Sequence, residues 1–438
     1  MSSIMHYISY LCLYSFSRIC YFLPHSALRF LAKVAGSIAY VASPKFRKRT
    51  TSNLALASKL QLSNRTIRQL SKAAFHNLMI TLFEFGKLSR KSFIEKIVDH
   101  KSIDLANNLM QASSGIVFFC GHQANWEILF LDGILRFRKG MAIARPLKNP
   151  FICRWVQSVR ETYGGEIIPQ REALRKGIRG LRSGISIGIV GDQGMPESSF
   201  SSEFLGRTAW TSTAPALFAY KTNSPIVVMS IARKGKKYEI TYSNPILPDL
   251  SAPLDTEIPR LMKLTLAEFE KSIEKNPDQW LWLHNRWKQE TPAHLYYRFC
   301  MDSLLVILPR SDAFAEYEGL IPLIEEIYPK AFLTLLIPIE LERHIYSSRW
   351  EIHRYIDKEE MLLEDYRFKL VFNFSGIKSI KKHFLRYSVF EVFTFSDIYA
   401  IAKEHKHLDP KTTYSKSEIF VRALCRPGTY WKRETHAS

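Results

Sequence analysis

The sequence predicts an α/β protein with a largely parallel sheet flanked by helices, an N-terminal membrane-anchor helix and a second α/β module at the C-terminal end. From residue 115 onward, short apolar runs rich in β-branched and aromatic residues alternate with segments of helical periodicity, as in domains with parallel sheets. The alternation resumes after residue 293, and the first 43 residues are apolar but interrupted by cations. A chain of 438 residues is long enough for two domains, each with its own core.

The N-terminal segment predicts attachment to a membrane. "IMHYISYLCLYSFSRICYFL" (4–23) has about the 20 residues that a membrane-crossing helix needs, although it contains Arg18. Residues 27–42 are also apolar and interrupted, and "PKFRKR" (44–49) adds four cations. A signal peptide would begin with a basic region, and this segment does not. We therefore expect residues 1–43 to span or lie on a membrane, with the basic cluster on its anionic cytoplasmic face. The alternative is a pair of amphipathic helices packed on the protein's own core.

The order of the elements follows from periodicity. Apolar residues at spacings of three and four predict helices over 53–110. After them, each predicted strand is followed by a predicted helix, until two strands occur in succession and a long helix closes the block. The predicted strands are 115–120, 139–145, 165–170, 185–194, 225–234 and 237–246, and the predicted helices are 124–137, 149–164, 171–184, 211–221 and one that begins near 261. This alternation indicates a mainly parallel sheet.

The charge balance favours an anionic partner. Lys and Arg number 61 against 41 Asp and Glu, a net charge of +20, which suits nucleic acid, an anionic membrane or a phosphorylated substrate. The sequence has no zinc-finger spacing, no aromatic RNA-binding motif and no basic region leading into a heptad repeat, so a membrane or a phosphorylated lipid is favoured over nucleic acid. The six cysteines are scattered, which argues against a structural zinc site and a disulfide framework and fits a reducing compartment. We therefore predict neither a metal nor a cofactor.

A histidine follows the first predicted strand. In "IVFFCGHQANWEILF" (116–130), His122 lies at the carboxyl end of the strand, where open α/β sheets place ligands and catalytic groups. If His122 occupies the turn and Glu127 the start of the next helix, we expect the carboxylate of Glu127 to contact Nδ1 of the imidazole. Nε2 would then be free to take a proton from a substrate hydroxyl. The alternative is a capping arrangement in which an early glutamate is favoured by the helix dipole.

Several further motifs follow the histidine in order. Together with the first they are "GHQANWE", "ARPLKNP", "GDQG", "FLGR", "TSTAPALFAYKTNSPIVV" and "WLWLHNRWK". This ordered set resembles the lipid A biosynthesis acyltransferases, the lauroyl and myristoyl transferase family within the broader H-x4-D/E glycerolipid acyltransferase group. The resemblance covers roughly residues 1–290 and leaves the last third of the chain unexplained.

The resemblance implies a reaction. His122 would be the general base and Glu127 its orienting partner, and the attacking group would be a hydroxyl of a hydroxyacyl chain on a Kdo-bearing lipid A precursor. The acyl donor would be the thioester of an acyl carrier protein, and no cofactor would be needed. The protein would lie at the inner membrane, with its catalytic domain on the cytoplasmic side. A glycerol-phosphate or lysophospholipid acyltransferase with the same H-x4-E chemistry is the alternative, and a non-catalytic membrane-binding protein on the same fold is a third hypothesis.

The resemblance also implies a set of substrate-binding residues. Arg145, at a strand end, offers a planar fork of donors that suits a phosphate of the glycolipid acceptor; a surface arginine paired with a carboxylate is the alternative. Asp192 and Gln193 end another strand in the same layer as the predicted base and would belong to the active-site region, although Asp near Gly is also typical of turns. Asn125, within "GHQANWE", completes the set. The loop 194–206 is richer in serine than is usual in the family, so we expect a different acyl-chain or acceptor preference.

The predicted helix 171–184 has one basic side. Leu174, Ile178 and Leu181 fall on one face, and four arginines fall on the other. A solvated face is the simpler interpretation, and a surface for anionic lipid headgroups or an acidic carrier protein is the alternative. The four arginines are Arg171, Arg175, Arg179 and Arg182.

The sequence predicts three functional parts: a membrane anchor (1–43), the acyltransferase domain (44–292) and a Rossmann-like accessory module (293–438). Residues 304–338 faintly resemble the N-terminal half of heptosyltransferase-like glycosyltransferases, which bind the nucleotide-sugar mainly in a second Rossmann half. The module has no G-x-G-x-x-G and no P-loop motif, and the sequence ends too soon for a second half. We therefore expect a degenerate, glycosyltransferase-like half with an accessory role, on fold analogy alone.

Overall fold

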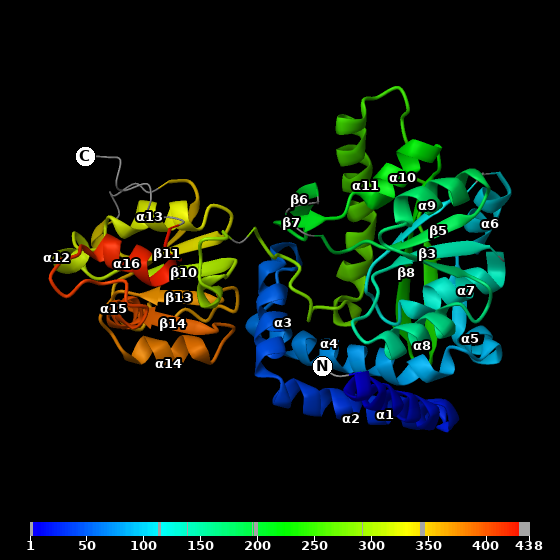
Figure 1. Ribbon diagram of the computed structural model, residues 1–438, viewed down its shortest axis with the longest axis horizontal. Helices are drawn as coiled ribbons and strands as arrows, with labels where there is room; N and C mark the ends of the chain where they lie inside the picture. The colour runs from blue at the N-terminus through cyan, green and yellow to red at the C-terminus, as the bar shows by residue number, and fades with distance from the viewer. Residues whose placement is uncertain are drawn as a thin grey trace. The chain divides into compact units, whose positions relative to one another are not determined.

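The computed structural model describes residues 3–112, 115–137, 139–194, 196, 200–290, 292–341 and 347–428. The chain divides into two compact units, each built around its own sheet (Figure 1). The first comprises Met1–Ser43, Lys59–Gln61 and Gln69–Arg286, and the second comprises Pro44–Ser58, Leu62–Arg68 and Trp287–Ser438. A helix near the N-terminus thus belongs to the second unit. The functional division at residues 43 and 292 stays a prediction.

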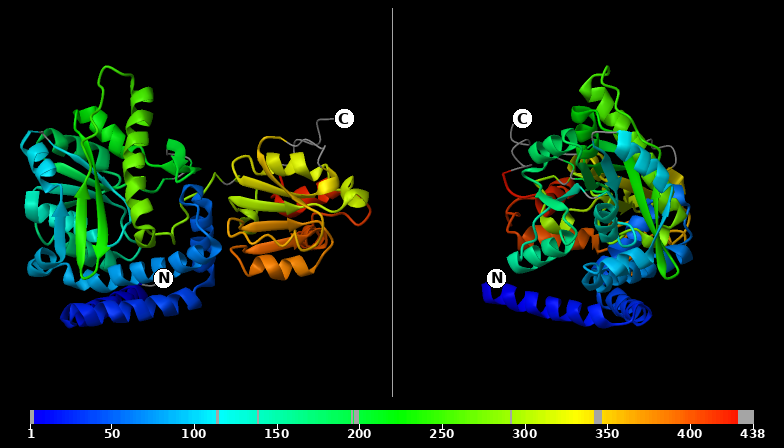
Figure 2. Two further views of the ribbon diagram at one scale, coloured as in Figure 1. Left: turned by 180° about the vertical axis from the view of Figure 1, so that it is seen from behind. Right: turned by 90° about the vertical axis from the view of Figure 1, so that its right-hand side faces the viewer.

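The chain begins with four helices: α1 (Ser3–Phe22), α2 (His25–Ala42), α3 (Pro44–Leu56) and α4 (Asn64–Glu84). Within the first unit, α1 and α2 lie next to α4, at the same end of the unit (Figure 2). Among the described residues, no helix combines the length and the apolar composition needed to cross a bilayer. Both helices expose large apolar side chains, among them Ile4, Ile8, Ile19, Phe22, Phe30, Leu31, Val34, Ile38 and Val41.

The six cysteines are all free. Cys12, on α1, is exposed, whereas Cys20, further along the same helix, is buried. The stability of both units therefore comes from core packing and polar contacts rather than from cross-links.

The first unit contains a seven-stranded sheet of order β1-β9-β8-β2-β5-β3-β4. All neighbouring strands are parallel except β8 and β9, so the predicted, largely parallel sheet is confirmed. The edge strand β1 lies within a region that the sequence predicts as helical, and that part of the prediction is wrong. The strands are β1 (Val98–Lys101), β2 (Val117–Cys120), β3 (Gly140–Ala144), β4 (Glu166–Pro169), β5 (Ser186–Val190), β8 (Ile226–Lys234) and β9 (Lys237–Tyr242).

Helices cover both faces of this sheet. Side chains alternate along a strand, so Phe118 of β2 packs with Ile128 and Leu131 of α7, while Phe119 contacts Phe269 of α11 on the other face. Burial on both faces explains why β2 is a continuous apolar run. The helices are α5 (Lys91–Ile97), α6 (Ile103–Ala112), α7 (Glu127–Phe137), α8 (Pro150–Arg160), α9 (Ala173–Arg182), α10 (Ala214–Thr222) and α11 (Leu254–Lys275).

A short hairpin lies between β5 and α10 in the sequence. Its strands, β6 (Phe200–Phe204) and β7 (Arg207–Thr211), are antiparallel. Strand β6 falls within the segment 194–206 that the sequence predicts as a serine-rich loop, so that part of the prediction is wrong; residues 195 and 197–199 of the segment lie outside the described residues. The altered substrate preference predicted from that loop therefore stays a prediction.

The second unit contains a five-stranded, fully parallel sheet of order β12-β11-β10-β13-β14. In chain order this is 3-2-1-4-5, the order in which a Rossmann sheet arranges its first five strands, and the predicted second α/β module with a parallel sheet is confirmed. The strands are β10 (Ser303–Ile307), β11 (Phe332–Pro338), β12 (Trp350–Tyr355), β13 (Leu370–Asn373) and β14 (Glu391–Thr394).

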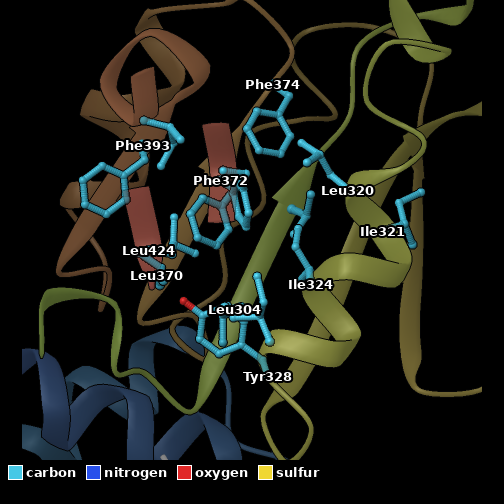
Figure 3. Packing of buried hydrophobic residues seen from close by; sticks show 14 of the residues in the cluster. Leu304, Leu320, Ile321, Ile324, Tyr328, Leu370, Phe372, Phe374, Phe393 and Leu424 are labelled. Atoms are coloured by element: carbon cyan, nitrogen blue, oxygen red, sulfur yellow. The ribbon is translucent and has the colours of Figure 1, made fainter. Parts of the chain in front are cut away.

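Two apolar clusters pack on opposite faces of this second sheet. On one face, Leu304 of β10 and Phe372 of β13 pack against Leu320 and Ile324 of α13 and Leu424 of α16 (Figure 3). On the other face, the strand residues that alternate with Leu304 and Phe372 pack against α14. The helices of this unit, apart from α3, are α12 (Ser311–Phe314), α13 (Leu320–Ile327), α14 (Ser379–Leu385), α15 (Phe395–Glu404) and α16 (Lys416–Leu424).

Candidate active site

Three neighbouring parallel strands of the first sheet end in polar residues. His122 is the second residue after β2, Asp192 is the second after β5, and Arg145 directly follows β3. Strand β5 pairs with β2 on one side and with β3 on the other. Because the carboxyl ends of parallel strands share one edge, all three residues lie at the edge where open α/β sheets bind ligands.

Glycines allow two of these strand ends to pass close to the core. A Cβ built on Gly121 would lie 2.0 Å from the ring of Phe269, and one built on Gly191 would lie 2.6 Å from the ring of Phe119. Any larger residue would displace backbone or ring, so glycine is needed immediately before both His122 and Asp192. The tight packing fixes where these two side chains leave the sheet.

His122 and Asp192 form a hydrogen-bonded pair. Nδ1 of His122 lies 2.7 Å from Oδ1 of Asp192, and the backbone N–H of His122 donates to Oδ2 at 2.9 Å. Trp280 Nε1 also donates to Oδ2, at 2.8 Å. The Asp192 side chain is 1 % exposed, whereas that of His122 is 23 % exposed. A buried carboxylate thus holds a partly accessible imidazole in one orientation.

The pair shifts both pKa values in favour of the charged forms. Burial alone would raise the pKa of Asp192, but the charge and hydrogen bonds of His122 and the Trp280 hydrogen bond hold it well below its usual range. Burial alone would lower the pKa of His122, but the charge and hydrogen bond of Asp192 outweigh it and raise that pKa. Because the carboxylate is ionised, Nδ1 carries the hydrogen of the neutral imidazole and Nε2 holds its lone pair. No hydrogen bond to Nε2 occurs among the described residues.

Glu127 does not contact the imidazole as the sequence predicted. Its carboxylate accepts two hydrogen bonds from Arg160, the last residue of α8: Nε donates to Oε2 at 2.8 Å and Nη2 donates to Oε1 at 2.6 Å. The planar fork of arginine matches both carboxylate oxygens, and Asp192 already accepts from Nδ1 of His122. The Glu127 charge makes only a smaller contribution to the raised pKa of His122. The predicted contact is therefore wrong, whereas a catalytic role for Glu127 stays a prediction.

Arg145 and Arg160 line one small pocket. Together with Leu147, Cys153 and Ile167 they surround a cavity of about 50 Å³. Arg145 is exposed and makes no hydrogen bond or ion pair with the described residues, whereas Arg160 is bound to Glu127. Sequence reasoning missed Arg160, for which the one signal is its position in the last turn of a helix that follows the Arg145 motif. The pocket therefore offers one unneutralised guanidinium to an anionic ligand.

Two other predicted residues differ in their placement. The Gln193 amide nitrogen lies 3.3 Å from Nδ1 of His122, beside the shorter Asp192 contact, so Gln193 borders the imidazole. Asn125 is fully buried, and its side chain donates to Glu84 at 2.9 Å. The Asn125 amide faces the protein interior, and its predicted contact with a substrate stays a prediction.

An apolar pocket begins next to the imidazole. Trp126 lies edge-on to His122, with ring centroids 4.9 Å apart, and its side chain lines a cavity of about 70 Å³ between α7 and the strands β2, β3 and β5. Phe130 and Gly133 continue the lining along α7 towards Phe137 at the end of the helix. A Cβ built on Gly133 would meet no atom within 4 Å. The pocket thus provides a mainly apolar environment that extends from the site along one helix.

The aromatic motif "WLWLHNRWK" (280–288) holds Asp192 in place. Trp280 contacts Trp282 at 4.6 Å between ring centroids in addition to its hydrogen bond to Asp192. Arg286, also in the motif, is buried and donates to Thr211 Oγ1 at 2.7 Å. Burial lowers the pKa of Arg286 to about 10, with the Asp192 charge acting in the opposite direction. This part of the motif packs and holds the carboxylate rather than facing the opening of the site.

Known proteins resemble about the first two thirds of this chain. The family model of bacterial lipid A biosynthesis acyltransferases matches residues 2–289, more than half of the chain. The chain is also similar to the lipid A biosynthesis lauroyltransferase of Escherichia coli (strain K12), with 29 % identity over 157 residues, which cover 34 % of this chain. The matched region spans about half the length of that relative, 48 %. On the extent of the family match, the chain belongs to the bacterial lipid A biosynthesis acyltransferase family.

Proposed function

We propose that this protein transfers a fatty acyl chain from the thioester of an acyl carrier protein to a hydroxyacyl group of a Kdo-bearing lipid A precursor. The observation that carries the proposal is the His122–Asp192 pair, which lies at the sheet edge with Nε2 open and an apolar pocket beside it. Membership of the family supports the reaction class. The carrier protein and the Kdo-bearing acceptor come from the resemblance of the motifs.

The proposed chemistry needs a base, an orienting carboxylate and a binding site for each substrate. Nε2 of His122 takes the proton of the acceptor hydroxyl as its oxygen attacks the thioester carbonyl, and the charge of Asp192 stabilises the imidazolium that forms. When the carbon–sulfur bond breaks, the imidazolium returns the proton to the leaving thiolate. One ester forms, one thioester is consumed, and His122 is neutral again.

The surroundings of His122 suit both substrates. The pocket lined by Trp126, Phe130 and Gly133 is the proposed site of the donor acyl chain, because burial of methylene groups is favourable there. Arg145, at the neighbouring strand end, is the proposed contact for a phosphate of the acceptor. Four exposed arginines are the proposed docking surface for the acidic carrier protein: Arg171, just before α9, and Arg175, Arg179 and Arg182 of α9.

The proposed location is the cytoplasmic face of the inner membrane. The apolar side chains that α1 and α2 expose would lie in the interfacial region of the bilayer. The four cations of residues 44–49 would favour an anionic leaflet. A lipid acceptor could then reach the protein without leaving the membrane.

The decisive experiment uses the full-length protein in detergent with Kdo-bearing lipid IVA and a panel of acyl carrier protein thioesters, with products read by mass. The proposal expects acceptor mass to increase by one acyl chain. A parallel arm supplies the same donors with lysophosphatidate and with glycerol phosphate, and a further arm supplies coenzyme A thioesters. Acylation of the glycerolipids in place of lipid IVA would favour the glycerolipid alternative, and hydrolysis of donors without any transfer would reject both.

A further inference from the structure

The last residue of α4 is a completely buried carboxylate. Glu84 is 0 % exposed and accepts hydrogen bonds from Arg29 Nε (2.8 Å), Asn125 Nδ2 (2.9 Å) and the Tyr238 hydroxyl (2.5 Å), with Nε2 of His25 also 2.8 Å away. Burial alone would raise the pKa of Glu84, but the His25 hydrogen bond and the Arg29 charge lead the contributions that lower it to about 2. Glu84 is therefore ionised at neutral pH. A charge in this position is maintained by its partners, since removal of one would leave it uncompensated.

One of these partners lies in the turn that carries His122. Asn125 follows Ala124, whose φ of +46° is in the left-handed region that residues with a Cβ rarely adopt. The turn is held from two sides: the N–H of Ala124 donates to the carbonyl of Gln279 at 2.7 Å, and Thr81 Oγ1 of α4 donates to the carbonyl of Ala124 at 2.8 Å. Because a strained turn persists only when its surroundings hold it, the Glu84–Asn125 hydrogen bond is one of the contacts that determine where His122 points.

Two other partners come from α2. Arg29 donates from Nε to Glu84 and from Nη1 to the carbonyl of Gly235, in the turn between β8 and β9, at 2.6 Å. Its guanidinium also lies 5.2 Å from the centroid of the Tyr238 ring. Helix α2 is the same helix that exposes apolar side chains on its other face. A single buried carboxylate thus connects the N-terminal helices with the turn that presents His122.

We propose that Glu84 is a positioning residue for acyl transfer, which fixes the turn of residues 121–126 through Asn125 and is itself held by Arg29 of α2. The inference rests on the proposed role of His122 as the base. Glu84 touches neither substrate nor reacting atoms, so its effect on the reaction passes through the geometry of the turn. Loss of the hydrogen bond would leave substrates bound but the base misplaced.

Three variants separate positioning from stability. Glu84→Gln keeps the shape of the side chain but removes its charge, and Asn125→Ala removes the Glu84–Asn125 hydrogen bond while leaving the Glu84–Arg29 ion pair intact. Glu257→Gln is the matched control: Glu257 is 1 % exposed and accepts from Arg260 at the start of α11, with no contact to the turn. If Glu84→Gln fails to fold, Asn125→Ala still carries the test.

The first measurement is amide hydrogen exchange of peptides that cover residues 121–126, which does not depend on any substrate. Both Glu84→Gln and Asn125→Ala should speed exchange there by about tenfold or more, as expected for loss of a hydrogen bond to a charged group. Glu257→Gln should leave this segment unchanged even if its Tm falls. Unchanged exchange in folded Glu84→Gln or Asn125→Ala would overturn the inference.

The second measurement is steady-state kinetics. Both variants should lower kcat by about tenfold or more while both KM values change by less than about threefold, because only an interaction that matters in the transition state is lost. The double variant should be no worse than the worse single variant, since one substitution weakens and the other removes the same Glu84–Asn125 contact. Additive losses, or losses that only follow the folded fraction, would contradict the positioning role.

His122→Ala in the same kinetic assay separates the two proposals. If His122→Ala is inactive while Glu84→Gln and Asn125→Ala keep wild-type kcat, the positioning role fails and the proposed chemistry stands. If His122→Ala keeps full activity, the proposed chemistry fails. The exchange data then decide by themselves whether Glu84 holds the turn.

Discussion

The two large sheets of this protein carry different groups at the carboxyl ends of their parallel strands. At the carboxyl ends of β2 and β5, an imidazole with one open nitrogen meets a buried carboxylate. At the carboxyl end of β13, the buried amide of Asn373 donates to the carbonyl of Ile377 at 3.0 Å and accepts from Ser375 Oγ at 2.6 Å, so both its nitrogen and its oxygen are bonded within its own turn. Both sheets have a carboxyl edge, and the residues at that edge determine whether it can catalyse a reaction.

In the second sheet, a buried ion pair lies at the amino ends of the strands, opposite to the carboxyl edge where Asn373 lies. Asp302 and Lys369 precede β10 and β13, and Lys369 Nζ donates to Oδ1 of Asp302 at 2.6 Å. Both are almost fully buried, and the pair joins the amino ends of two neighbouring strands. A charge pair of this kind is directed into the protein, whereas His122 faces an opening. The comparison predicts that reactivity is confined to the first sheet.

The largest expected effect comes from the imidazole. His122→Ala should lower acyl transfer by about 10²–10⁴-fold, the usual contribution of a general base, and its Tm should fall because the buried Asp192 carboxylate loses a partner. Asn373→Ala, at the carboxyl edge of the second sheet, serves as the control and should change activity by less than about twofold, although Tm falls as a buried hydrogen bond is lost. Activity of His122→Ala within about threefold of wild type, or a large loss in Asn373→Ala, would break the comparison.

The next largest effect distinguishes the two carboxylates near His122. Asp192→Asn should lower kcat/KM by about 10²-fold, because a neutral amide cannot stabilise the imidazolium. Since the Asp192 charge raises the pKa of His122, its removal should lower that pKa, and the acidic limb of the kcat/KM profile should move to lower pH. Glu127→Gln should lower kcat/KM by about tenfold, because it releases Arg160. It should shift the acidic limb of the profile less than Asp192→Asn does.

Profiles of kcat/KM against pH for the wild type and both variants check this order. A larger shift of the acidic limb in Glu127→Gln than in Asp192→Asn would make Glu127 the partner of His122 during turnover. That result would restore the contact predicted from the sequence and would require rearrangement of the turn on substrate binding.

A third prediction concerns the length of the acyl chain. Gly133 lines the apolar pocket and has open space at its Cβ position, so larger side chains should fill the pocket without a clash. The series Gly133→Ala, Gly133→Leu and Gly133→Phe should progressively reduce kcat/KM for long-chain donors while short-chain donors retain theirs. Replacement of a glycine within a helix by alanine removes a cost of about 0.5–1 kcal/mol, so Tm should not fall. An unchanged preference in folded Gly133→Phe would place the acyl chain elsewhere.

The smallest expected effect is at the exposed arginine. Arg145→Ala should raise the KM for the phosphorylated acceptor by about threefold to tenfold with little change in kcat, because a phosphate contact held throughout the reaction is uniform binding. Arg145→Lys should restore part of the loss, since a point charge lacks the bidentate fork. Acceptors with and without the phosphate complete the comparison. Equal phosphate dependence in wild type and Arg145→Ala would assign the contact to another cation.

Apart from the hairpin of β6 and β7, which the sequence did not predict, the alternation of strands and helices between residues 115 and 275 was predictable because each of the other elements there is one uninterrupted periodic segment. Strand β1 was not, because its four residues follow a helical segment and pair with β9, about 140 residues later in the sequence. Strand β12 and helices α15 and α16 of the second unit were also left unassigned. β12 contains polar residues along its length, as an edge strand does.

The site was predictable where it depends on strand ends and not where it depends on side-chain partners. His122 and Asp192 could be placed in one layer because both follow buried strands. The choice between Glu127 and Asp192 as the partner of His122 depends on which side chain reaches Nδ1, and Arg160 competes for Glu127 from a helix 33 residues away. Local spacing contains no information about such a competitor. The burial of Asn125 against Glu84 depends likewise on a helix that the motif does not include.

The uneven accessibility of the cysteines makes the protein suitable for a spectroscopic measurement. Cys12 is exposed on α1, whereas Cys20 of the same helix is buried, and burial raises the pKa of the Cys20 thiol. An environment-sensitive maleimide dye should therefore label Cys12 first, because thiol reactivity requires both access and the thiolate form. Its emission would move to shorter wavelength if the native surface around Cys12 enters lipid, so α1 could report on its own surroundings without an engineered residue.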